Sequence, residues 1–434
     1  MKSAKPRKQL GLFDAVMIVM GGIVGAGIFM NPSEVAHRVH TPGLILGVWA
    51  LGGVVALCGA FIWAELATRL PGAGGQYLYL REAYHPAVAF LYGWVLLLVT
   101  QTGGMAAVAV TFAAYYRRLA GVQWSESAIA AAVLLGLTAI NCLGARAGSN
   151  VQSALMLLKT AAIAGLVAVG FAFGGHAAEA PRAMPSGFGL LRSIGAAMVP
   201  IAFAYGGWQT ATFVAGEMRD ARRDLSRGIL AGVAAVVVLY LAVNFVCLRV
   251  LGAEGLDRTS TPASEVVRIA LGERGAQWIA VGIAISTLGF LSQGMLTGPR
   301  VYYAMARDGL FFERVGRLGA RSGAPVTAIV LQGVLAAAIA CSGKYGEILN
   351  FEVTVDFISF GMTAAALFVL RRRESAGEGA GLYRAPGHPV TTGIFVLACA
   401  GIVASAIASS PANSATALAI LAAGVPVYWY WSRR

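Results

Sequence analysis

Glycine interrupts two long apolar segments of this chain, and the segments begin about 180 residues apart. The first covers residues 12–30, LFDAVMIVMGGIVGAGIFM, and the second covers residues 194–216, IGAAMVPIAFAYGGWQTATFVAG. A break in a membrane helix frees amides and carbonyls that find no water in lipid, so it is tolerated where unwound backbone lines a cavity. Interrupted segments at matching positions of two halves indicate the binding site of a membrane transporter.

The composition is that of a membrane protein. Apolar residues make up 58% of the 434 residues, and charged residues make up only 12%. Period-two alternation, which a porin-type barrel requires, is absent. Twelve apolar segments approach or exceed the roughly 20 residues that cross a bilayer. They are 12–33, 42–66, 86–116, 127–143, 151–174, 192–215, 228–250, 276–305, 325–342, 347–370, 390–409 and 413–431. We predict an all-α membrane protein with 12 transmembrane helices in a single domain, residues 1–434.

The positive charge is distributed unevenly over the predicted connections. If the even-numbered connections and both termini share one side, that side carries 22 of the 33 Lys and Arg residues, and the other side carries 10. Such a bias predicts a multi-pass protein of the inner (cytoplasmic) membrane with both termini in the cytoplasm. The net charge of +13 does not indicate nucleic-acid binding, because no basic patch belongs to a soluble domain.

The two broken segments each open a set of five helices. The first set covers residues 12–174 and the second covers residues 192–370, which leaves two peripheral helices over residues 390–431. Five helices followed by five place the second set upside down in the membrane. We therefore predict an inverted repeat in which helices 1 and 6 are unwound at the midplane, where the substrate binds.

Unwound backbone at the two breaks predicts a binding site with two polar ends. In GIVGAGIF, the amides of residues 25–27 start a half-helix whose positive dipole end favours an anion such as a carboxylate. The stretch FAYGG, residues 203–207, frees carbonyls that suit an ammonium group. The candidates are Gly25, Ala26 and Gly27 for the carboxylate of an α-amino acid, and Phe203, Ala204 and Gly206 for its amine. The alternative interpretation is that these glycines only allow close helix packing.

Lys159 lies inside the fifth apolar segment, in LMLLKTAAIAGL. An ammonium group within a membrane is unfavourable, so it usually faces the helix bundle and has partners there. The alternative is a side chain that snorkels to the interface, but Lys159 lies about eight residues into its segment. We therefore expect a functional role for this lysine.

Glu352 and Asp356 stand one helical turn apart near the start of the tenth segment, on one face of the helix. At the binding site they would attract a cationic substrate or exchange a proton. We prefer the interpretation that they form a solvated outer vestibule face with an arginine such as Arg38 as partner. In that position they would lie too far out to reach a bound side chain.

Residues for other chemistry are scattered along the chain. The five cysteines show no C-x-x-C spacing and the five histidines lie in connections, so we predict no disulfide, no metal site and no cofactor. A nucleophile–base pair, a phosphate-binding loop and a soluble output domain are not evident in the sequence. A membrane enzyme or sensor is therefore disfavoured.

Five sequence blocks point to a known family. They are MIVMGGIVGAGIFMNP, RLPGAGGQYLYLREAY, FAYGGWQTATFVAGEM, GPRVYYAMARDGLFF and YRAPGHPV. In this order, over about residues 10–400, the chain resembles the amino acid–polyamine–organocation (APC) superfamily, in particular its L-type amino acid transporter branch and bacterial relatives. The resemblance implies the LeuT-type five-plus-five fold and secondary transport of amino acids by alternating access. It also implies that segment 1 amides bind the carboxylate and segment 6 carbonyls bind the amine.

The resemblance suggests roles for single residues. Phe203 stands where an aromatic side chain closes over the substrate from the extracellular side. Trp208 and Gln209 follow the break and would line the side-chain pocket, and Gln209 stands where relatives often carry Asn. Glu217 would be a gate charge on the cytoplasmic side.

Lys159 stands where sodium-coupled relatives hold a cation that touches segments 1 and 8. Its ammonium would replace the sodium ion, with three possible partners on segment 8, Ser286, Thr287 or Ser292, among which the sequence does not choose. We therefore expect no sodium coupling.

The function that we predict is transport of small to medium neutral L-amino acids, by sodium-independent exchange or proton coupling. The alternative is a transporter or antiporter of cationic amino acids or polyamines with the same fold. The neutral class is preferred because residues 205–212 contain no acid to meet a second ammonium group. No disulfide-linked heavy subunit is expected, because residues 117–126 contain no cysteine. The sequence does not define the oligomeric state.

Overall fold

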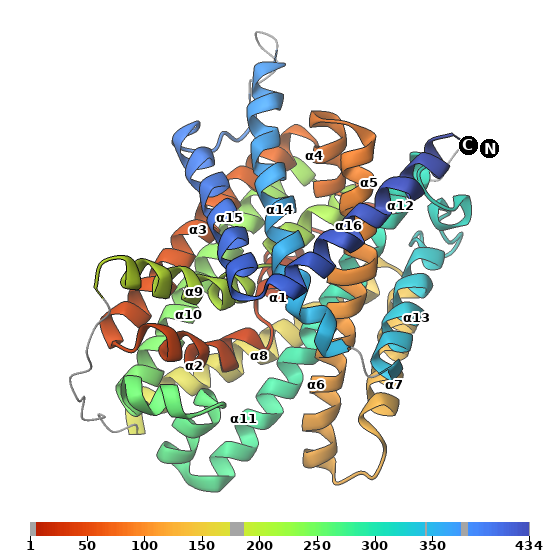
Figure 1. Ribbon diagram of the computed structural model, residues 1–434. Coiled ribbons are helices and arrows are strands. Elements are labelled where there is room, and N and C mark those ends of the chain that lie inside the picture. Colours follow the sequence, from red (N-terminus) through yellow and green to blue (C-terminus); the bar gives the residue numbers. More distant parts are fainter. Residues whose placement is uncertain (1–5, 174–185, 343–344, 375–380, 434) are drawn as a thin grey trace.

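The computed structural model describes residues 6–173, 186–342, 345–374 and 381–433, and their regular elements are all helices (Figure 1). Within this part of the chain, nine helices are long and apolar enough to cross a membrane, and the number is ten if the bent N-terminal pair forms one span. No strand occurs among these residues, although Leu10 and Met218 form an isolated backbone bridge. The predicted all-α membrane fold is confirmed.

The first half of the chain contains the broken N-terminal pair and the helices that follow it. Its elements are α1 (Leu12–Ile23), α2 (Gly27–Val39), α3 (Pro42–Arg69), α4 (Gln76–Ala83), α5 (Pro86–Val95), the π-helix η1 (Leu96–Gln101), α6 (Thr102–Ala120), α7 (Glu126–Cys142) and α8 (Ala145–Phe173). The run from α5 through η1 to α6 forms one span, Pro86–Ala120.

The second half begins with another broken helix and ends with two long helices. Its elements are α9 (Phe188–Tyr205), the 3₁₀-helix η2 (Trp208–Glu217), α10 (Ala221–Arg258), α11 (Pro262–Thr297), α12 (Pro299–Arg307), the 3₁₀-helix η3 (Glu313–Gly316), α13 (Val326–Ser342), α14 (Tyr345–Arg372), α15 (Val390–Ser409) and α16 (Pro411–Ser432).

Two of the twelve predicted segments correspond to shorter helices. The segments 127–143 and 325–342 coincide with α7 and α13, each of which has 17 residues. Both helices are apolar but shorter than the other candidate spans. The total of 12 transmembrane helices therefore stays a prediction.

Both predicted helix breaks are present. α1 ends at Ile23 and α2 begins at Gly27, and the two axes differ by 42°. In the second break, Gly206 is extended and Gly207 has a φ of 111°, in the left-handed region that glycine adopts without strain. Because neither linker continues the helix, each break frees backbone groups within the bundle.

The two breaks lie against each other. A Cβ atom on Gly22 would be 2.6 Å from the carbonyl oxygen of Gly207, and a Cβ atom on Gly207 would be 2.1 Å from that of Gly22. Side chains larger than hydrogen would therefore separate the two helices. Glycine at both positions brings the unwound backbones into one region of the molecule.

The helices of the two halves pack in a repeated pattern. α3 packs against α10, and α7 packs against α13. α8 packs against α11, just as α14 packs against α6. In an inverted repeat of five helices, α3 corresponds to α10, α7 to α13, α8 to α14 and α6 to α11. When each helix is exchanged for its counterpart, the same set of contacts results, as expected for such a repeat.

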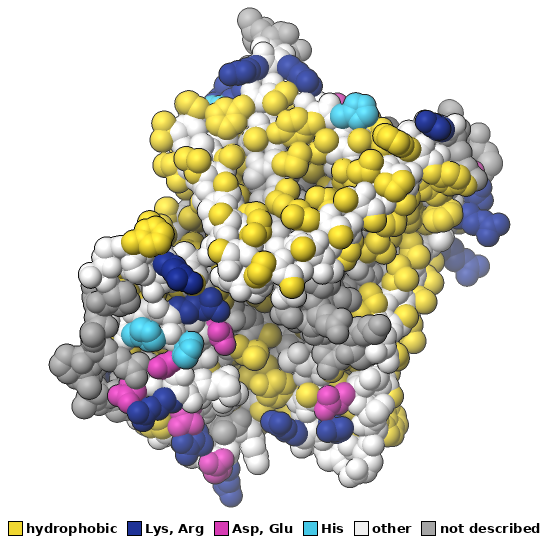
Figure 2. Space-filling view, viewed as in Figure 1, with side chains coloured by type: hydrophobic (Ala, Val, Ile, Leu, Met, Phe, Trp, Pro, Cys, Tyr) yellow, Lys and Arg dark blue, Asp and Glu magenta, His cyan; other side chains and the backbone are white. Residues whose placement is uncertain are grey.

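Apolar side chains cover the outside of the bundle. On the face seen in Figure 2, hydrophobic side chains form a broad area over α15 and α16, and charged side chains gather toward its margins. Large hydrophobic side chains on these helices are exposed, among them Leu397 and Trp429. A surface of this kind suits the hydrocarbon region of a bilayer.

Candidate substrate-binding site

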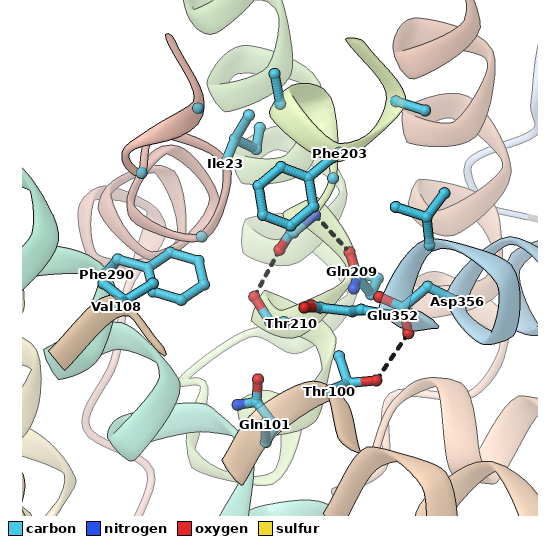
Figure 3. A pocket seen from close by; sticks show the side chains of 18 of the residues that line it. Ile23, Thr100, Gln101, Val108, Phe203, Gln209, Thr210, Phe290, Glu352 and Asp356 are labelled. Atoms are coloured by element: carbon cyan, nitrogen blue, oxygen red, sulfur yellow. Dashed lines mark hydrogen bonds between the residues drawn. The ribbon is translucent and has the colours of Figure 1, made fainter. Parts of the chain in front are cut away.

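A cavity of about 100 Å³ lies where the two broken helices meet (Figure 3). Backbone of both breaks forms one part of its wall, and side chains from η1, α11 and α14 form the rest. The six residues that the sequence predicts for the two polar ends all line it: Gly25, Ala26, Gly27, Phe203, Ala204 and Gly206.

The amides at the first break are available to an anion. Among the described residues, the N–H groups of residues 25–27 donate to no other backbone group. They lie at the beginning of α2, where the helix dipole is positive. A Cβ atom on Gly25 would meet only Phe290, at 3.4 Å, so the missing side chain leaves space on the cavity side.

The carbonyls at the second break accept few hydrogen bonds, and these bonds are long. The Phe203 carbonyl accepts one long bond, 3.3 Å, from the Gly206 amide. The Ala204 carbonyl accepts a 3.3 Å bond from the hydroxyl of Tyr240. The Gly207 amide is turned away from its helical partner, because it donates to Oε1 of Gln209 at 3.1 Å. Since a carbonyl oxygen has two lone pairs, both occupied carbonyls retain capacity for an ammonium group.

Lys159 is fully buried and bonds to the end of α1. Its side chain is 0% exposed. Nζ donates to the carbonyl of Gly21 at 3.3 Å and makes a short bond to the carbonyl of Val24. These carbonyls lack helical partners because α1 stops at Ile23, so the ammonium completes the C-terminal end of a half-helix, where the dipole is negative. The snorkelling alternative is wrong.

Two of the three predicted partners of Lys159 on α11 bond elsewhere, and the third has no partner among the described residues. The hydroxyl of Ser286 donates to the Gly25 carbonyl at 3.3 Å, and that of Thr287 donates to Ala284 in its own helix. Oγ of Ser292 is buried without a partner among the described residues. The lysine therefore touches segment 1 through carbonyls, while α11 contacts the same break through Ser286.

Phe203 and Gln209 line the cavity, and the Phe203 ring extends over it in Figure 3. Trp208 does not line it, which corrects the prediction for this residue. Its indole is 1% exposed and packs edge-on against Trp63, at 6.3 Å between ring centroids. A Cβ atom on Gly59 would lie 2.8 Å from the indole, so this glycine of α3 makes room for the ring on the far side of η2.

The preferred interpretation of Glu352 and Asp356 is wrong. Both acids line the cavity, in which Figure 3 shows them on α14 beside Gln209. Arg38 pairs with Glu34, at 3.5 Å, and with the Ala196 carbonyl. The sequence correctly places the two acids on one helix face, but that face turns toward the breaks.

Several cavity residues are missing from the sequence-based prediction. Thr100 and Gln101 come from the π-helix η1, and Thr210, Phe290 and Gln293 come from η2 and α11. The sequence offers one signal for the polar members of this group. Polar side chains inside apolar segments tend to face the helix bundle, where a binding cavity would lie. π-helical turns also occur frequently at functional sites.

Glu217 forms a buried ion pair whose partner the sequence does not reveal. Nε and Nη2 of Arg300 each lie 3.1 Å from a carboxylate oxygen of Glu217, and the two residues are 2% and 3% exposed. The adjacent backbone binds the N-terminal segment: the amide of Gln9 donates to the Glu217 carbonyl at 2.8 Å, and the amide of Arg219 donates to the Leu10 carbonyl at 2.8 Å. These contacts fasten η2 and α12 together at one end of the cavity region.

No cluster of His, Cys, Asp and Glu that could hold a metal ion occurs in the part of the chain that the structure describes. A multi-pass helical bundle with two touching helix breaks around a cavity has the architecture of a secondary transporter. The chain belongs to the amino acid permease family, which matches residues 10–430.

Proteins with similar sequences are named as amino acid transporters or exchangers. The serine/threonine exchanger SteT of Bacillus subtilis (strain 168) is 30% identical, over 99% of this chain and 98% of the relative. The b(0,+)-type amino acid transporter 1 of Mus musculus is 28% identical, over 86% of this chain and 77% of the relative. The Asc-type amino acid transporter 1 of Mus musculus is 26% identical, over 98% and 81%. The function of this chain is amino acid transport across a membrane.

Proposed function

We propose that this protein exchanges small to medium neutral L-amino acids across the cytoplasmic membrane by alternating access. The observation that carries the proposal is the meeting of free amides at residues 25–27 and accessible carbonyls at residues 203–206 in one cavity. A zwitterion fits these two ends through backbone contacts alone. We favour exchange over proton coupling because SteT, which is similar to this chain over 98% of its own length, is named a serine/threonine exchanger.

The two polar ends of the cavity support a substrate that carries both a carboxylate and an amine. Putrescine lacks the carboxylate that the amides of residues 25–27 would bind.

Sodium has no part in the proposed mechanism. The ammonium of Lys159 supplies a fixed positive charge to the carbonyls of Gly21 and Val24 at the end of α1. A sodium ion at the same carbonyls would be repelled by this charge and would find its oxygen ligands occupied.

The excess of Lys and Arg on one side supports an orientation with both termini in the cytoplasm. With that orientation, the Arg300–Glu217 pair and the N-terminal segment lie on the cytoplasmic side of the cavity and close it. Phe203, which is 40% exposed, lies on the other side as the proposed extracellular gate. The five-plus-five repeat, residues 12–174 and 192–370, accounts for the repeated packing pattern of the helices. We propose no disulfide-linked heavy subunit.

Competition for uptake tests the proposed substrate class. Purified protein in proteoliposomes loaded with unlabelled serine is given labelled serine together with an excess of one unlabelled compound. Alanine, serine and threonine should each reduce uptake at least tenfold, and empty vesicles should take up little label. Arginine, lysine and putrescine should compete poorly. Arginine competing better than every neutral amino acid would contradict the proposal.

A further inference from the structure

A buried ion pair lies at the end of the helix that leads away from the proposed substrate cavity. η2 begins beside this cavity, which Gln209 and Thr210 line, and it ends at Glu217. Glu217 is about 16 Å from Gln209 along a 3₁₀-helix that rises roughly 2.0 Å per residue. At that end, Glu217 and Arg300 together line a second, small cavity.

The small cavity adjoins a larger hollow of about 540 Å³. Four residues line both spaces, and they are Pro6, Ala73, Gly216 and Tyr303. Charged side chains also line the hollow, which suits it to water. They are Lys8, Arg81, Arg307 and Asp308. The order along η2 is therefore substrate cavity, ion pair and polar hollow, so a substrate that leaves by this route passes between Glu217 and Arg300.

The ion pair is well protected from solvent in the closed structure. Arg300 is 2% exposed and Glu217 is 3% exposed. Nε and Nη2 of Arg300 bond to the two carboxylate oxygens, each at 3.1 Å. Separating two buried charges is strongly unfavourable unless each finds another partner of opposite charge. In an empty transporter no such partner is supplied, and the pair stays closed.

Arg300 has one nitrogen without a partner. Nη1 is buried and has no hydrogen-bond partner among the described residues. A buried donor that stays unpaired is unfavourable, so it favours the approach of an acceptor. Because the guanidinium presents its donors in a planar fork, a carboxylate can bind at Nη1 before the bonds to Glu217 are released.

We propose that the substrate inserts into the Glu217–Arg300 pair during transport, with its carboxylate on Arg300 and its ammonium on Glu217. The inference rests on the proposed function, because it takes the substrate to be a zwitterionic amino acid. Both charges of the pair then keep an opposite partner while η2 and α12 separate. The loaded transporter therefore opens toward the hollow, whereas the empty transporter stays closed. Exchange, in which one amino acid leaves only when another enters, follows from this property of the pair.

Removing both charges of the pair tests the inference. Uptake of labelled serine is measured in proteoliposomes that contain unlabelled serine and in empty ones. For the unaltered protein, the loaded vesicles should take up at least tenfold more. In the double variant Glu217→Gln, Arg300→Met, uptake into loaded vesicles should fall, because the zwitterion loses both partners. The ratio of loaded to empty vesicles should fall to about twofold or less, because no ion pair holds the empty transporter closed. A ratio that stays at least tenfold would overturn the inference.

An exposed ion pair provides the matched control. Glu313 and Arg317 pair at 2.8 Å and are 85% and 68% exposed. The double variant Glu313→Gln, Arg317→Met should therefore keep the ratio of the unaltered protein. The same drop in ratio in this control would assign the effect to a general loss of charge and overturn the inference.

Arg300→Lys keeps the charge of the pair and removes the planar fork, so it gives a second test if the double variant does not fold. Exchange by Arg300→Lys should still require internal serine but should be at least threefold slower, because an ammonium cannot hold both carboxylates in the same way. Exchange at the unaltered rate would overturn the role of Arg300 as the partner of the substrate carboxylate.

The failure of this inference differs from the failure of the proposed function. If the unaltered protein exchanges serine and the Glu217→Gln, Arg300→Met variant still requires internal serine, the inference is rejected and the proposed function stands. If the unaltered protein fills loaded and empty vesicles equally, exchange itself is contradicted. That result would also overturn the inference, because the pair would not hold the empty transporter closed.

Discussion

Gly25 and Gly27 flank the same break but face different surroundings. A Cβ atom on Gly27 would lie 3.3 Å from the Asn31 side chain and 3.4 Å from Ala204, so this glycine lets α2 approach α9. A Cβ atom on Gly25 would meet only Phe290. The sequence treats the two glycines alike, because it cannot show which one packs and which one faces the cavity. Gly25 is therefore the better position for testing the carboxylate end.

Replacing Gly25 by valine should reduce serine uptake at least tenfold and leave the protein monodisperse, because the added methyl groups occupy the proposed carboxylate position. Uptake into proteoliposomes and size-exclusion profiles measure the two effects. Gly47→Val is the matched control, since Gly47 on α3 has no atom within 4 Å of an added Cβ. Uptake by Gly25→Val equal to that of the control would place the carboxylate elsewhere.

At Lys159, replacement by methionine keeps most of the length of the side chain and removes its charge. The carbonyls of Gly21 and Val24 lose their donor, so the end of α1 is no longer held and uptake should fall at least tenfold. The neighbouring Thr160→Ala should retain uptake, because its hydroxyl bonds only to Met156 in the same helix. Full uptake by Lys159→Met in sodium-free buffer would exclude a role for the ammonium group.

Burial of Lys159 was predictable at the residue scale, but its partners were not. A lysine deep in an apolar segment must find partners inside the protein. Which partners it finds depends on how the end of α1 lies in the folded bundle, where Gly22 and Gly207 approach each other closely. The acids show the same limit. A spacing of four residues puts Glu352 and Asp356 on one face, while the rotation and depth of α14 result from packing of the whole bundle.

Among the elements, η2 and α12 are joined by the Glu217–Arg300 pair. Removing one partner of a buried ion pair leaves an uncompensated charge and destabilises proteins by about 3–5 kcal/mol. Glu217→Gln should therefore lower the melting temperature in detergent and reduce uptake. The double variant Glu217→Gln, Arg300→Met should recover most of the melting temperature but not the uptake. The single variant Arg300→Met is measured as well. If the double variant loses as much melting temperature as the two single variants together, Glu217 and Arg300 are not coupled.

Helix breaks were easier to predict than the contacts made by the elements around them. Glycine and proline mark the breaks in the sequence, since they interrupt the helix locally. The bonds between Leu10, Glu217 and Arg219 involve backbone atoms far apart in the chain, and no side chain signals them. The orientation of Trp208 likewise depends on the space that Gly59 provides on another helix.

At the scale of the whole molecule, the two halves bring one break each to a common cavity. This arrangement fits the proposed sodium-independent exchange of amino acids, because each half would contribute one end of the proposed zwitterion site. The packing of α3 on α10 and of α7 on α13 relates the halves, but the sequence does not predict which helices touch. Substrate class was harder to predict, since it depends on side chains that the fold brings in from η1, α11 and α14.

The most direct test of the central claim is counterflow of labelled serine in proteoliposomes, measured in sodium chloride and in choline chloride. Vesicles loaded with unlabelled serine should accumulate label at the same rate in both salts, and unloaded vesicles should accumulate at least tenfold less. Uptake that requires sodium would contradict the role of Lys159, and uptake that is equal in loaded and unloaded vesicles would contradict exchange.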